Sequence, residues 1–297
     1  MGCVKSERGK EITAVTTIGA RAFLLTSLVV FASGSSTAGE PNNVEGERWS
    51  VSVGAMGFYF LAPYDAVSEG ISGGEDVDTS GSQVGYRLSV GKARNTVGIA
   101  VYNGGYTIED SQVYSDAGSK RSEINIDRID GDLGWAHALS EDENGGWGFV
   151  LGVKYVGADK TITVRETNGG HTDFRKFTGD ATWWLGTIGV FGSLRLSRNL
   201  PLSLFGSFNT SLGAVDGMVA LQKDDMNDAV IENVYGEDSS AAYGLNGTLG
   251  LRYLVFSHFS LEIGYRGQIL NSTDGFMTTA NFYDGQHALF LAGDILF

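Results

Sequence analysis

The sequence predicts an all-β protein, a transmembrane antiparallel up-and-down β-barrel of about ten strands, with eight or twelve strands as alternatives. Three observations support this prediction. Apolar and polar residues alternate with a period of two from Trp49 to Phe297, glycine accounts for 43 of 297 residues, and the connections alternate between short and long. No window holds the roughly 18–20 continuous apolar residues that a membrane-spanning helix needs, which excludes a helical membrane protein.

Residues 1–38 are predicted to be a signal peptide rather than part of the fold. An apolar segment at 22–32 follows a basic region and precedes the small residues Ser36, Thr37 and Ala38. We expect cleavage near Ala38, which leaves 39–297 as a single barrel domain without cysteine, because Cys3 is the only cysteine. The alternative, N-myristoylation at Gly2, leaves the apolar segment unexplained.

Each predicted strand is a run in which one face is apolar and the other is small or polar. In Tyr243 to Val255, the odd positions are apolar except for Gly247, whereas the even positions include Gly, Asn, Thr and Arg. Because successive strand residues point to opposite faces, such a run has a lipid face and a lumen face. Ten runs begin near Trp49, Gln83, Thr96, Glu123, Gly146, Thr172, Pro201, Ala241, Phe259 and Gln286.

The connections between these runs are short at one rim of the predicted barrel and long at the other. Those at 92–95, 140–145, 197–200 and 256–258 are short, whereas those at 63–82, 108–121, 213–240 and 271–285 are long, and 166–171 is intermediate. Short turns on one rim and long loops on the other are typical of an outer-membrane barrel, with the short turns periplasmic. The predicted location is therefore the outer membrane of a Gram-negative bacterium.

Large aromatic residues fall at the predicted short-turn rim, where they would form an interfacial girdle. A soluble β-sandwich does not require such a girdle, and a lipocalin-like barrel turns its apolar face inward. The predicted girdle residues are Trp49, Trp135, Trp147 and Phe297.

The last part of the chain resembles a known class. The run from Gly247 to Gly267 and the ending Ala288 to Phe297 resemble the closing strands of bacterial outer-membrane β-barrels, and the terminal Phe297 resembles the signal that such barrels present to their assembly machinery. The resemblance implies contacts with that machinery, with outer-membrane lipid and with lipopolysaccharide. The class includes porins, adhesins, structural anchors and lipid-modifying enzymes, so it does not fix an activity.

Charged residues on the predicted lumen face are the candidate functional residues. Pairing the strands around the turn at 256–258 places Arg252 opposite Glu262. The set either neutralises itself as a structural network or lines a constriction that filters small solutes. Its members are Arg87, Asp132, Lys154, Arg252, Glu262, Arg266 and Asp294.

Catalytic, metal and nucleic-acid sites are not predicted. His258 and Ser260 with Glu262 resemble a lipid A deacylase pattern, but they fall at a periplasmic turn. Asp130, Asp132 and the distant His137 do not reproduce the paired Asp/Asp and Asp/His pattern of the outer-membrane protease barrels. The acidic residues between Asp216 and Glu237 lack calcium-loop spacing, and a net charge of -14 disfavours nucleic acid. No cofactor, metal or enzymatic activity is expected. We expect a narrow porin-like channel for small solutes or ions, because the residues around Arg252 and Glu262 are Gly, Ser, Thr and Asn rather than large apolar side chains. The alternatives are a closed structural or adhesive barrel with acidic surface loops and, third, a lipid-modifying barrel enzyme.

Overall fold

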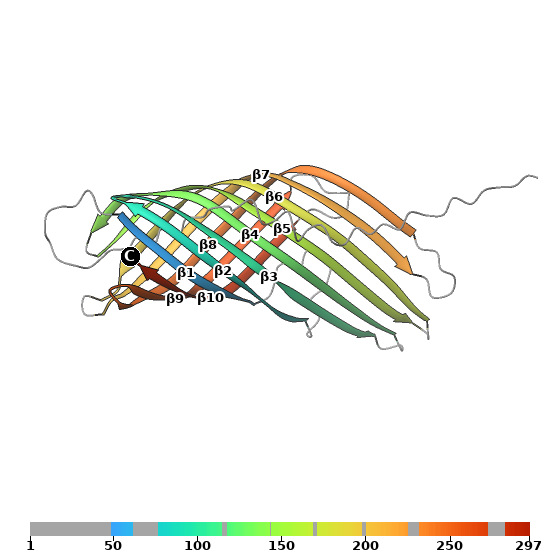
Figure 1. The fold of residues 1–297 in the computed structure, drawn as a ribbon. Coiled ribbons are helices and arrows are strands. Elements are labelled where there is room, and N and C mark those ends of the chain that lie inside the picture. Colours follow the sequence, from blue (N-terminus) through green and yellow to red (C-terminus); the bar gives the residue numbers. More distant parts are fainter. Residues whose placement is uncertain are drawn as a thin grey trace, which may run out of the picture.

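The chain folds into a closed antiparallel β-barrel. The computed structural model describes residues 49–61, 77–114, 118–142, 144–168, 171–197, 200–224, 232–272 and 283–297, so the predicted signal peptide lies outside the described residues. In this part of the chain, ten strands each pair with their sequence neighbours, and the first pairs with the last (Figure 1). They are β1 (Trp49–Phe60), β2 (Val77–Lys92), β3 (Asn95–Tyr114), β4 (Gly118–Asp142), β5 (Gly145–Asn168), β6 (His171–Arg195), β7 (Leu202–Asp224), β8 (Glu232–Phe256), β9 (Phe259–Ser272) and β10 (Tyr283–Leu296).

The predicted fold class is confirmed, including the number of strands. The described residues contain no helix that could cross a membrane. Strand ends next to the short turns lie close to the predicted positions, because the turn residues there interrupt a clear alternation.

The long-connection side was predicted wrongly in one respect. Much of 108–121 and 213–240 was assigned to loops, yet β3 and β4 cover most of the first segment, while β7 and β8 cover most of the second. The alternation reverses there: Ile108 and Ile124 are buried, whereas Glu109 and Arg121 on the outer face are exposed. A strand with its polar side outward does not match the apolar-outward pattern of a lipid-facing strand, so the alternation alone predicts a loop there.

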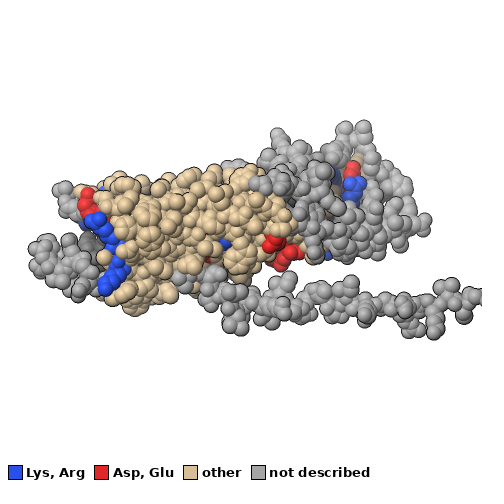
Figure 2. All heavy atoms as spheres, turned by 90° about the horizontal axis from the view of Figure 1, so that it is seen from above, with Lys and Arg blue, Asp and Glu red and all other residues tan. Residues whose placement is uncertain are grey.

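The outer surface of the barrel carries an apolar belt. On the face drawn in Figure 2, the middle of the barrel carries almost no charged side chain, whereas Lys and Arg gather at one end. Polar residues end the belt at Asn103 on β3, Asp127 on β4 and Asp159 on β5. The belt includes the exposed side chains of Val84, Tyr86, Leu88, Val153, Ile188, Leu249, Ile263 and Leu291.

The predicted girdle residues lie towards the short turns. Trp49, Trp147 and Phe297 are exposed at strand ends there, and the Lys92 ammonium lies 5.1 Å from the centre of the Trp49 ring. Trp135 lies further along its strand from the β4–β5 turn, and its indole N–H donates to Asn95 Oδ1 at 3.1 Å.

The lumen contains two buried apolar clusters. The larger one joins β1, β3, β4 and β10 and includes Phe58, Tyr102 and Phe290, and the smaller one includes Trp183 and Leu185. Phe58 packs edge-on against Tyr102, with ring centres 5.1 Å apart, and lies 6.0 Å from Phe290. These rings fill the middle of the barrel beside the charged residues described next.

Candidate functional site in the barrel lumen

Ten charged side chains form what we call the lumen network. Five are basic and five are acidic, so their formal charges cancel, and ion pairs join them into three groups. The basic members are Arg87, Arg128, Lys154, Arg252 and Arg266, and the acidic members are Asp130, Asp132, Glu262, Asp284 and Asp294.

The first group is centred on Glu262, on β9. Its Oε1 accepts from Arg252 Nε at 2.7 Å, and its Oε2 accepts from Arg87 Nη2, also at 2.7 Å. Arg252 and Glu262 are register partners on β8 and β9, as predicted from the turn. The Glu262 carboxylate therefore holds two guanidinium groups from different strands.

Arg87 also binds Asp294, which lies two strands away. Arg87 Nε donates to Asp294 Oδ1 at 2.6 Å, and its Nη2 donates to Oδ2. Gly54, on β1, is the register partner of both residues, and a Cβ there would collide with Asp294 Oδ1. The missing side chain of Gly54 thus allows the two charged groups to meet across β1.

The second group is centred on Asp132, on β4. Lys154 Nζ donates to it at 2.7 Å from the register-paired position on β5, and Arg266 Nη2 donates from β9 at 3.4 Å. The Arg266 guanidinium also lies 5.5 Å from the centre of the Phe58 ring and 5.2 Å from that of Tyr102. These cation–π contacts join the charged groups to the aromatic cluster.

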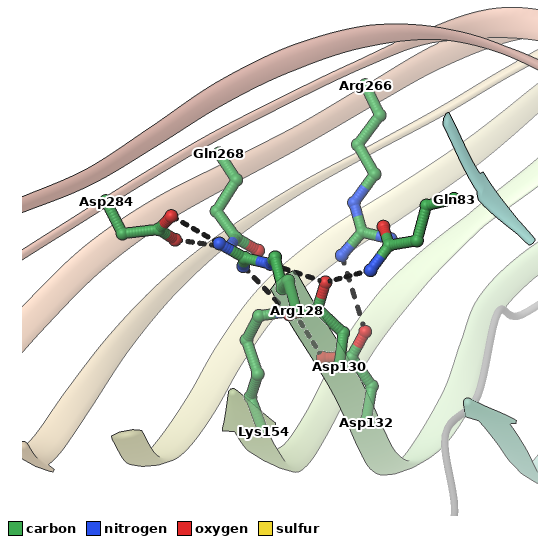
Figure 3. Close-up of polar contacts among 8 residues, drawn as sticks. All are labelled: Gln83, Arg128, Asp130, Asp132, Lys154, Arg266, Gln268 and Asp284. Atoms are coloured by element: carbon green, nitrogen blue, oxygen red, sulfur yellow. Dashed lines mark hydrogen bonds and ion pairs between the residues drawn. The ribbon is translucent and has the colours of Figure 1, made fainter. Parts of the chain in front are cut away.

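The third group is centred on Arg128 and is drawn in Figure 3. Arg128 Nε and Nη2 each donate to Asp130 at 2.8 Å, and Nη1 donates to Asp284 on β10, across the lumen. Gln83 Nε2 donates to Asp130 at 2.9 Å, while Gln268 Nε2 donates to Asp284 at 3.3 Å. One guanidinium and two amides therefore bind the two carboxylates.

All seven predicted lumen residues lie inside the barrel and take part in the network. Arg128, Asp130 and Asp284 were not predicted as lumen residues, and neither were the amides of Gln83 and Gln268. Strand parity was the available signal, because Arg128 and Asp130 lie on the same face of β4 as Asp132. Asp284 was missed because it fell within the segment assigned to a loop.

The side chains considered for enzymatic chemistry have different environments and partners in the structure. His258 is exposed at the β8–β9 turn, Ser260 is buried, and the Glu262 carboxylate is bound to two arginines. His137 packs against Trp135 and Phe149, with ring centres 5.8 and 5.5 Å away, respectively, whereas Asp130 belongs to the lumen network. Within the described residues, no group of three or more metal-ligating side chains is found, and residues 225–231 of the acidic segment lie outside them.

Sequence comparisons identify no relative: no protein-family model and no curated protein matches the chain. Solved structures similar in fold include the outer membrane protease OmpT from Escherichia coli, with 14% identity, a TM-score of 0.47, and coverage of 88% of this chain and 99% of that one. The translocator domain of the autotransporter NalP from Neisseria meningitidis has 11% identity and a TM-score of 0.38, with coverage of 86% and 89%.

The attachment invasion locus protein Ail of Yersinia pestis has 12% identity and a TM-score of 0.28, with coverage of 86% of this chain and 100% of that one. These solved structures are bacterial outer-membrane β-barrel proteins, the class that the closing strands resemble. Because the identities and TM-scores are low, we transfer no activity, ligand or partner from them to this chain.

Proposed function

We propose that the protein is an integral outer-membrane β-barrel whose lumen is closed, and that it anchors a polar β-sheet wall beyond the membrane. The observation that carries this proposal is the burial of the lumen network. Glu262 and Lys154 are each 1% exposed and Arg128 is 3% exposed. This differs from the narrow porin-like channel expected from the sequence.

The contacts within the network argue for a closed lumen, because the charged side chains pair with one another. In a conducting constriction, charged side chains face water and exchange contacts with permeating ions. Here Glu262 accepts from two arginines, and Arg128 donates to two carboxylates. Ion pairs removed from water in this way need complete partners, since an uncompensated buried charge is strongly destabilising.

The aromatic cluster strengthens the same argument. Phe58, Tyr102 and Phe290 are buried beside Arg266, and Phe205 lies 6.3 Å from Phe290 between ring centres. Rings packed across a lumen leave little room for a continuous column of water. The charged and aromatic side chains together support a lumen that is closed by side chains of the barrel strands.

The membrane position follows from the apolar belt. Lipid-facing strands of about 9–11 residues suffice to cross a bilayer, whereas β4, β5, β6 and β8 have 24 or 25 residues each. With the short turns in the periplasm, the strand residues that are not needed to cross the bilayer extend outside the cell. Outer-membrane lipid, lipopolysaccharide and the barrel assembly machinery are the partners that this placement implies.

We call the outward extension of β4, β5 and β6 beyond Asp127, Asp159 and Asp180 the polar wall; in Figure 1 the long strands extend past the shorter β1 and β2. Its outer face is polar and carries both signs of charge. Arg121 Nη2 donates to Glu109 of the adjoining β3 at 2.8 Å, and both side chains are about half exposed. Such a surface suits contacts in water with macromolecules rather than contacts with acyl chains, which favours a structural or adhesive role.

Solute flux into liposomes tests the closed lumen. Purified, refolded protein in liposomes should give no swelling in an iso-osmotic solution of a pentose, whereas a general porin reconstituted at the same protein-to-lipid ratio should give rapid swelling. Heat-modifiability on SDS gels verifies that the reconstituted protein is folded. Swelling at a rate that scales with the amount of folded protein would refute the closed barrel and would support the porin-like channel.

A further inference from the structure

A groove lies in the outer wall of the barrel, close to the short turns. Its volume is about 480 Å³. Trp147, Leu194 and Leu249 line it, and each of these residues is more than half exposed. The groove therefore opens to the outside of the barrel rather than into the lumen.

The groove exists because two glycines lie side by side in this part of the wall. One row of register partners runs from Trp147 on β5 through Gly192 on β6 and Gly206 on β7 to Leu249 on β8. The glycines contribute no side chain, so a gap separates Trp147 from Leu249 on the outer face. A Cβ at Gly192 would lie 3.5 Å from its nearest neighbour, which is ordinary contact, so packing within the wall does not require a glycine there.

The groove changes from apolar to polar towards the β4–β5 turn. Leucines and glycines line one end, whereas Ser140, Asp142 and Asn144 line the end at the turn. Asp142 Oδ1 accepts hydrogen bonds from the backbone N–H groups of Asn144 at 2.8 Å and of Gly145 at 3.1 Å. These bonds hold the Asp142 carboxylate at the polar end of the groove.

The charge at the polar end indicates a cationic group in the ligand. Asp142 is the only charged residue among the described residues that line the groove. Arg195 lies close by, since its backbone N–H donates to Asn144 O at 2.6 Å, but its Nε donates to the carbonyl oxygen of Ser197 at 3.1 Å. An exposed carboxylate at the end of an apolar groove is complementary to an amphiphile that carries an ammonium group.

A lipid chain fits such a groove better than a second barrel does. Trp147 is one of the exposed aromatic residues near the short turns, so the groove lies where headgroups meet acyl chains. The outer face of another barrel is convex and cannot fill a narrow gap between side chains, whereas a flexible acyl chain can. In a bilayer the gain comes from van der Waals packing, since lipid tails are as apolar as the leucines of the wall.

We propose that the groove binds one phospholipid with an ammonium headgroup from the periplasmic leaflet. One acyl chain lies over Gly192 and Gly206, and the ammonium group lies beside Asp142. This inference rests on the proposed membrane position, with the short turns in the periplasm. It adds a partner to the closed barrel, namely a specific lipid on its outer wall.

Native mass spectrometry of folded protein in detergent tests the site, with palmitoyl-oleoyl phosphatidylethanolamine as the probe. The wild type should bind one molecule of this lipid more tightly than phosphatidylglycerol with the same acyl chains. The ratio of the two Kd values should be roughly two to five, the range expected for an exposed ion pair. Gly192→Leu should raise the Kd for phosphatidylethanolamine several-fold, because the new side chain occupies the space of the acyl chain. Gly192→Val is the second variant if Gly192→Leu does not give a heat-modifiable band.

Gly57→Leu is the matched control for the filled groove. Gly57 lies on β1 between its register partners Val84 and Leu291, which are both more than half exposed, so it also faces outward. A Cβ at Gly57 would meet no atom within 4 Å, and Gly57 does not line the groove. This variant should bind phosphatidylethanolamine as the wild type does.

Asp142→Asn tests the headgroup separately from the chain. It removes the charge but keeps the oxygen that accepts from two backbone N–H groups, so the turn is retained. The variant should still bind lipid, but it should no longer prefer phosphatidylethanolamine to phosphatidylglycerol.

Equal Kd values for the wild type and Gly192→Leu would overturn the proposal, and so would a lipid preference that Asp142→Asn leaves unchanged. A wild-type dimer that Gly192→Leu dissociates would also overturn it, because a second copy would then occupy the groove. These results are distinguishable from failure of the proposed function, which is measured by solute flux and by membrane fractionation.

Discussion

Replacement of Glu262 by alanine gives the sharpest test of the lumen network by mutation. Glu262→Ala removes the carboxylate that binds both Arg252 and Arg87, while Arg87 keeps its two hydrogen bonds to Asp294. Breaking a buried ion pair by removing one partner costs about 3–5 kcal/mol. Since Arg87 retains the Asp294 carboxylate, we expect the folding free energy to fall by an amount near the lower end of this range, about 3 kcal/mol.

A matched control is available where the polar wall meets β3. Glu109→Ala breaks the Arg121–Glu109 pair, which has a similar N–O distance of 2.8 Å but side chains that are 49–59% exposed. Exposed pairs contribute about 0–1 kcal/mol, so this variant should be nearly as stable as the wild type. The two variants remove the same kind of side chain from opposite environments.

The assay is urea-induced unfolding and refolding in lipid vesicles, followed by tryptophan fluorescence and by the folded band on unheated gels. The double variant Glu262→Ala, Arg252→Ala should recover part of the loss, because the guanidinium is removed together with its carboxylate. If Glu262→Ala and Glu109→Ala are equally mild, water reaches the network and the argument for a closed lumen fails.

Three further predictions concern the class of the protein, its assembly and its pH dependence. Protein purified from membranes should have a strand-dominated circular dichroism spectrum and run faster on SDS gels before heating, because a closed sheet pairs its backbone groups; a helical spectrum contradicts this. Phe297→Asp should lower the amount of folded protein in the outer membrane, measured by fractionation, and unchanged amounts would count against a role of the terminal aromatic in assembly. Partial burial and the neighbouring Asp127 carboxylate raise the pKa of Asp159, at the outer edge of the belt, so folding favours its protonated form. Asp159→Asn should therefore stabilise the protein at neutral pH by less than about 1 kcal/mol, and this gain should shrink as the pH falls through the raised pKa, whereas a gain that grows in acid would refute the reasoning.

Local alternation was sufficient to predict the barrel and part of the network. The inner face of β8 and β9 could be assigned from the apolar residues that flank Arg252 and Glu262, and a tight turn sets their register. Such contacts join neighbouring strands, so they depend only on which face of its strand each residue points to and on the length of the turn. The sequence therefore carries enough information for them.

Contacts across the lumen were beyond the reach of that reasoning. Arg128 reaches Asp284 from β4 to β10, and Arg87 reaches Asp294 across β1. Whether such groups meet depends on the diameter of the barrel and the stagger of its strands, which no single strand pair specifies. The inward aromatic rings were not predicted for a related reason: both faces of β1 are apolar near Phe58, so alternation alone did not identify which rings point into the lumen.

The measurement that tests the closed lumen most directly is the single-channel current of purified wild-type protein in a planar bilayer. The buried network and the aromatic cluster predict no stable conductance steps at moderate voltage in symmetric potassium chloride, even when folded protein is shown to be in the membrane. Reproducible steps whose ion selectivity shifts towards anions in Glu262→Ala would contradict the account, because they would show that water and ions pass beside Glu262.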